Sequence, residues 1–136
     1  MADFKVVSEE QLRTVYATIA TATAIEAGDL VALDTGLIVK AEAADTAIAY
    51  APEAHAANSG SKIAVTVGND FVLEGTGDAV FAVTQKGTEV DLVGTTTLLI
   101  DVGESTTDVF KVDISEDAGT VAATTGIRVR INKPLF

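Results

Sequence analysis

Apolar and polar residues alternate over short stretches along most of the chain, and turn residues separate the stretches. The last stretch is the clearest, because Ile127, Val129 and Ile131 alternate with Arg128 and Arg130. This alternation places the apolar residues on one face of a strand. From Glu26 onward the pattern predicts strands in LVALD, LIVKA, TAIAYA, KIAVTV, DFVLE, AVFAVT, TEVDLV, TLLID, VFKVDI and GIRVRI.

Turn residues lie between these predicted strands. Gly28 in EAGD is free to take a positive φ, and Asp34 to Gly36 separate two strands. Gly68 and Asn69 predict a two-residue hairpin between KIAVTV and DFVLE. In PEAHAANSG, Pro52 is suited to the first position of one or two helical turns.

The first 25 residues give two conflicting signals. Ser8 to Gln11 match a helix capping box, and apolar residues follow at helical spacing. The same segment is rich in β-branched residues, which favour a strand. We therefore divide the chain into an N-terminal arm, residues 1–25, and a single β domain, residues 26–136, and leave open whether the arm is helix or strand. We expect the arm to take its structure from a partner, with a helix packed on its own domain as the alternative.

The predicted fold is mainly β. Turn signals recur about every 8–12 residues, which is typical of a compact β-sandwich or β-barrel. We expect such a β-tulip-like body with at most one or two short helices beside the arm.

Charge narrows the classes of partner. The net charge is −11, from nine basic and twenty acidic residues, so a nucleic-acid partner is not expected. No apolar run approaches the about 18 residues of a membrane span, and MADFKVVSEE lacks the apolar core of a signal peptide. We expect no membrane partner and synthesis in the cytoplasm. The chain has no cysteine, which excludes thiolate metal sites.

No catalytic template fits the sequence. His55 is the single histidine and lies among small residues, and GES at Gly103 lacks the second glycine of a nucleophile elbow. GTGDAV lacks the third glycine of a dinucleotide loop, and DISED does not match a calcium loop. Thr46 stands where a lipoyl or biotinyl domain has its acceptor lysine. We therefore expect no catalytic residue, metal ligand or cofactor, and no enzyme activity.

The order of segments from Thr21 to Gly75 resembles the capsid decoration proteins of tailed bacteriophages, typified by the lambda head-stabilising protein. The resemblance rests on TATA at Thr21, VALDT at Val31, the strand and polar loop of TAIAYAPEAHAANSG, and IAVTVGNDFVLEG. The segment beyond Thr84 is longer than in the short members of that family and is similar to wider β-barrel decoration proteins that end on a strand such as GIRVRI.

This resemblance implies a structural protein on the outer capsid surface of a virion, bound to the major capsid protein and commonly a homotrimer. The negative charge suits an outer surface. An arm rich in β-branched residues can add to an open sheet edge, and we expect deletion of residues 1–20 to abolish binding while the β domain stays folded. The expected apolar contacts of the arm are Phe4, Val6, Val7, Leu12, Val15, Tyr16 and Ile19.

Two alternatives stay open. A head-fibre base or an adhesion module on a virion or cell surface has the same absence of catalytic motifs.

At the C-terminus, Leu135 and Phe136 follow Pro134, and such terminal apolar residues dock on a neighbouring subunit or pack back on their own subunit.

Overall fold

A computed structural model describes residues 3–9, 13–20, 23–57, 62–69, 71–95 and 97–135. Over these residues the fold is mainly β, with two antiparallel sheets and two short 3₁₀ helices, which confirms the predicted class. The elements are β1 (Lys5–Glu9), β2 (Arg13–Thr18), β3 (Leu30–Asp34), β4 (Leu37–Lys40), β5 (Ala49–Tyr50), β6 (Lys62–Val67), β7 (Phe71–Gly75), η1 (Val83–Gln85), β8 (Glu89–Val93), β9 (Leu99–Asp101), β10 (Phe110–Val112), η2 (Glu116–Ala118) and β11 (Ile127–Ile131).

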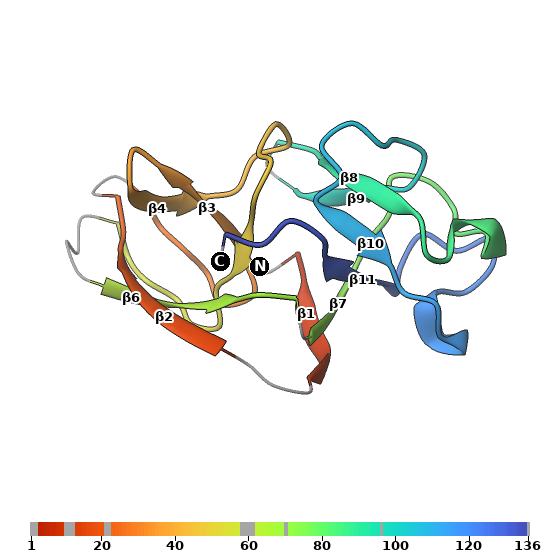
Figure 1. Cartoon of the computed structure of the whole chain (residues 1–136), viewed down its shortest axis with the longest axis horizontal. Helices are drawn as coiled ribbons and strands as arrows, with labels where there is room; N and C mark the ends of the chain where they lie inside the picture. The colour runs from red at the N-terminus through yellow and green to blue at the C-terminus, as the bar shows by residue number, and fades with distance from the viewer. Residues whose placement is uncertain are drawn as a thin grey trace.

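The two sheets occupy the two halves of the molecule along its long axis (Figure 1). In the described part of the chain, one sheet has six strands in the order β1-β7-β11-β10-β8-β9, and the other has five in the order β2-β6-β5-β3-β4. The described residues form no closed barrel, and the arrangement is consistent with a sandwich.

The N-terminal segment pairs with both sheets. β1 is antiparallel to β7, and β2 is antiparallel to β6. Glu9 lies opposite Phe71, and Arg13 lies opposite Val67. The two paired segments therefore pass from one sheet to the other over the same number of residues, and their register is the same at both points. Of the two conformations left open for this segment, the strand is the one observed.

The hairpin predicted at Gly68 and Asn69 is wrong. β6 and β7 belong to different sheets, and both pair with the N-terminal segment instead of with each other. Gly68 has the expected positive φ of 89°, but Asn69 does not. A type I′ hairpin needs positive φ at both central residues. The glycine therefore lies where the chain passes from one sheet to the other.

The turn predicted between LVALD and LIVKA is confirmed. Asp34 pairs with Leu37, which leaves Thr35 and Gly36 as a two-residue loop with φ of 51° and 84°. Both angles are positive, as a type I′ turn requires. This turn fixes the register of β3 on β4, and it leaves Val31 and Leu33 on the opposite face of the sheet from Leu30.

Two buried cores follow from this alternation. The larger core takes Leu30 and Ile48 from the five-stranded half and Phe71, Phe110 and Ile127 from the six-stranded sheet. Most of its residues come from the six-stranded half. The smaller core lies on the opposite face of the five-stranded sheet and consists of Ile19, Ile25, Val31, Ile38, Ala49, Ala51, Ile63, Val65 and Val67.

Two further segments differ from their predictions. AVFAVT forms no strand: η1 begins within it at Val83, and Phe81 makes a single bridge to Val121. The described part of PEAHAANSG, Pro52 to Ala57, is not helical. His55 and Ile25 instead exchange two backbone hydrogen bonds of 2.9 and 2.7 Å. In both places a tertiary pairing between distant residues overrides the local preference.

Candidate functional site

The segment predicted as an arm forms one edge of both sheets. β1 is the edge strand of the six-stranded sheet and β2 that of the five-stranded sheet, and they run along the lower rim of the molecule in Figure 1. The edge of β1 carries Lys5 and a register shift between Val6 and Ser8. Charges and bulges of this kind protect an edge from adding another strand. Within residues 1–25, β1 and β2 are thus paired with the rest of the chain in this structure, and whether a partner reorders them stays a prediction.

The predicted contact residues of this segment lie in three different environments. Phe4 and Ile19 are buried, the first in the larger core and the second in the smaller. Val6, Val7 and Val15 are half-buried. Tyr16 alone among the described contact residues is a largely exposed side chain, at 69%. Leu12 lies outside the described residues.

Tyr16 is the centre of an open strand edge. β2 pairs with β6 on one side, with Tyr16 opposite Ala64, and no described strand pairs along its other side. Its far end approaches β4, where the Ala20 N–H donates to the Ile38 carbonyl over 2.9 Å. Arg13 to Thr18 are therefore a regular edge with exposed backbone, and their pairing with β6 shows no bulge of the kind that protects β1.

The C-terminal residues pack back on their own chain. Pro134 bridges to Ile48, and the Leu135 N–H donates to the Ile48 carbonyl over 3.0 Å. Leu135 packs against the smaller core and lines a small apolar cavity there with Val15 and Leu33. Of the two alternatives for Leu135, packing on the same subunit is the one observed. Phe136 lies outside the described residues.

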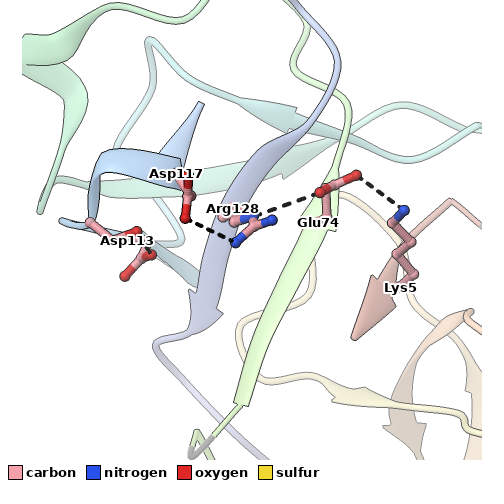
Figure 2. A network of polar contacts seen from close by, with 6 residues as sticks. Lys5, Glu74, Asp113, Asp117 and Arg128 are labelled. Atoms are coloured by element: carbon pink, nitrogen blue, oxygen red, sulfur yellow. Dashed lines mark hydrogen bonds and ion pairs between the residues drawn. The ribbon is translucent and has the colours of Figure 1, made fainter. Parts of the chain in front are cut away.

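A row of alternating charges crosses the outer face of the six-stranded sheet (Figure 2). The Lys5 Nζ lies 3.4 Å from the Glu74 Oε1, and the Arg128 Nε lies 3.7 Å from the Glu74 Oε2. Arg128 also reaches Asp117 at 4.0 Å. Each of the two cations in this row therefore has a carboxylate beside it. Each pair keeps at least one partly exposed partner, and ion pairs in contact with solvent contribute little to stability.

The neighbouring positions on the same face form a basic cleft. Lys111 and Arg130 lie directly opposite each other on β10 and β11. They line a cleft of about 300 Å³, which we call the Lys111–Arg130 cleft. No ion pair links either residue to a carboxylate among the described residues, and the Arg130 Nη1 donates to the Asn69 carbonyl over 3.3 Å. The remaining lining residues are Val112, Asp113, Ile114, Ile131 and Asn132.

Asp91 accepts more of the backbone hydrogen bonds found here than the other described carboxylates, and its role is structural. Its side chain is 8% exposed and accepts hydrogen bonds from the backbone N–H groups of Thr106, Thr107 and Asp108 over 2.8–2.9 Å. Burial alone would raise the pKa of Asp91, but these N–H donors outweigh it and lower the pKa below its ordinary value. All three donors belong to one loop, so Asp91 holds that loop against β8.

Sequence reasoning did not single out Asp91, Lys111 or Arg130 for a site. The spacing of Asp91 from its loop and of Lys111 from Arg130 is long, and strand pairing alone brings them together. No group of three His, Asp or Glu side chains in the described ranges is placed to hold a metal ion. Within those same ranges no helix is long and apolar enough to cross a membrane.

Comparison with known proteins identifies no relative of this chain. No protein-family model, no curated protein and no solved structure matches the chain. The functional argument therefore rests on the residues themselves.

Proposed function

We propose that this chain is a structural virion protein that binds the outer surface of the mature phage capsid and stabilises the lattice of the major capsid protein. The observation that carries the proposal is the open β2 edge with Tyr16 at its centre, 69% exposed. An extended segment of another protein can add to such an edge through backbone hydrogen bonds.

The exposed tyrosine suits this role. Tyrosine is enriched among the residues that contribute most to protein–protein interfaces. Tyr16 has threonines on both sides at Thr14 and Thr18, which are on the same face of β2 and are also exposed. A partner strand would gain its affinity from the backbone and its specificity from this aromatic side chain.

Two further features support the same assignment. The resemblance between Thr21 and Gly75 to capsid decoration proteins suggests the shell as partner. The net charge of −11 keeps crowded copies soluble on an outer surface and disfavours a surface that faces DNA. A homotrimer on the shell belongs to this proposal.

The structure changes how the proposal is best tested. Deletion of residues 1–20 would remove Phe4 and Ile19, which lie in the two cores. A loss of binding after this deletion would therefore also report a damaged fold. Substitution of Tyr16 leaves both cores intact and tests the edge alone.

The direct experiment is co-sedimentation of the purified protein with shells of the major capsid protein encoded in the same genome. Expanded, undecorated shells are compared with unexpanded shells. Saturable binding to the expanded shells alone supports the decoration role. A folded protein that binds neither form contradicts it and favours the head-fibre or adhesion alternative.

A further inference from the structure

The Lys111–Arg130 cleft is unusual for so acidic a chain. Two cations lie directly opposite each other on neighbouring strands, and like charges in this arrangement destabilise a sheet. Lys5 and Arg128, which belong to the row of charges on this face, each lie beside Glu74. Among the described residues, neither Lys111 nor Arg130 forms an ion pair with a carboxylate.

Two described carboxylates lie near this pair, but neither forms an ion pair with it. Glu89 lies opposite Lys111, but on the β8 side, away from Arg130. Asp113 also lines the cleft, and its carboxylate accepts the Ser115 hydroxyl over 2.6 Å. One Arg130 donor, Nη1, is used by the Asn69 carbonyl. The other N–H donors of Lys111 and Arg130 have no acceptor among the described residues and can bind one from outside.

The rim of the cleft indicates what kind of acceptor fits. Ile114 is 76% exposed and lines the cleft beside the two cations. A ligand with one anionic group and one apolar side chain would contact both. A peptide segment that carries a carboxylate and an aliphatic residue has this composition. A nucleic acid would bring many phosphates against a chain of net charge −11, which repels them.

We propose that the Lys111–Arg130 cleft binds a carboxylate-bearing segment of a partner protein. The identification of that partner as the capsid shell rests on the function proposed above. Arg130 supplies a planar fork that binds a carboxylate through two hydrogen bonds, and Lys111 adds a second positive charge. Binding at the cleft would weaken as salt concentration rises, because Lys111 is exposed to solvent and Arg130 is only half-buried.

The cleft itself is tested without shells. The backbone amide signals of Lys111, Ile114 and Arg130 are followed by NMR during titration with a capped peptide of sequence Gly-Leu-Glu-Glu-Gly. The control peptide has glutamine in place of both glutamates. Saturable shifts with the glutamate peptide alone, lost in Arg130→Glu, support the proposal. Equal or absent shifts with the two peptides overturn it, and so do larger shifts with a thymidine oligonucleotide, which would identify a nucleic-acid site.

The partner is tested with expanded shells and two matched variants. Arg130→Glu and Lys86→Glu change the net charge equally, and Lys86 lies outside the cleft. Arg130→Glu should fold normally, because it replaces a like-charge pair with an opposite-charge pair. We expect it to weaken shell binding about tenfold or more, and Lys86→Glu to bind as the wild type does.

The outcomes separate the two proposals. If the wild type and both variants bind shells equally, the cleft is not the shell contact and the proposed function stands. If the wild type binds the glutamate peptide but no shell, the carboxylate site stands and the proposed function fails.

Discussion

The ring of Phe4 covers Gly75 so closely that no side chain fits at position 75. A β-carbon added there would overlap two ring carbons of Phe4. Phe4 is 2% exposed, and its ring centroid lies 5.5 Å from that of Phe110. The first described residues of the chain are therefore anchored in the larger core, and the surface that the N-terminal segment offers to a partner is its edge and Tyr16.

Gly75→Ala should destabilise the protein by about 1–3 kcal/mol, because the added methyl group overpacks the core against the Phe4 ring. Urea unfolding of the single variant measures this cost. In a Phe4→Leu background the same change should cost clearly less, because the smaller side chain leaves room for the methyl group. An equal cost in both backgrounds would show that the ring is not the obstacle.

Asp91→Ala should reduce stability by about 1–3 kcal/mol at neutral pH, because the backbone donors of Thr106, Thr107 and Asp108 lose their acceptor. Burial raises the pKa of Asp91, but the N–H donors lower it by more, so the folded-state pKa lies below 3.8. Its contribution is therefore present above about pH 4 and is lost as pH falls through the lowered value. Unfolding curves between pH 2 and pH 7 test this, and a wild-type and variant difference that stays constant with pH would contradict it.

The contribution of Asp101 to folding stability depends on pH in the opposite direction from that of Asp91. Burial raises its pKa from 3.8, and the neighbouring Asp78 carboxylate raises it further. Asp101 therefore costs stability as pH rises through that raised value, because the folded state holds its proton more tightly than the unfolded state. Asp101→Asn should raise stability at pH 7 by about 0.5 kcal/mol and have a smaller effect near pH 3. Thermal unfolding at the two pH values measures the difference, and a destabilised variant at pH 7 would refute the assignment.

Leu135→Asp should destabilise the protein by about 1–3 kcal/mol, because Leu135 packs against the smaller core of the five-stranded sheet. Val121→Asp is the matched control, since Val121 is 61% exposed and its change should cost less than about 0.5 kcal/mol. Denaturant unfolding compares the two variants. Similar free energies of unfolding for the two variants would mean that Leu135 does not pack against the smaller core in solution.

Local sequence signals predicted those parts of the fold that depend on neighbouring residues. The Thr35 and Gly36 turn is such a case, because both residues take the positive φ that the turn type needs. β11 is another, since Ile127, Val129 and Ile131 are buried while Arg128 and Arg130 are half-buried. Alternation within one strand carries this information.

Structural features that depend on pairing between distant residues were not predicted from the sequence. Gly68 and Asn69 have the composition of a hairpin, yet the N-terminal segment separates β6 and β7 by pairing with both. The same limit applies to the candidate site. That Lys111 faces Arg130 follows from the register of β10 on β11, and this register is set by core packing rather than by either charged residue.

The most direct test of the account is the binding isotherm of Tyr16→Glu on expanded capsid shells, compared with the wild type and with Val121→Glu. Both substitutions replace an exposed apolar side chain, 69% and 61% exposed, with the same charge. If the β2 edge receives a strand of the shell, Tyr16→Glu should bind about tenfold more weakly or worse, because a charge on an edge opposes strand addition. Val121→Glu should bind as the wild type does. Tyr16→Glu that is folded and binds shells with wild-type affinity would contradict the account.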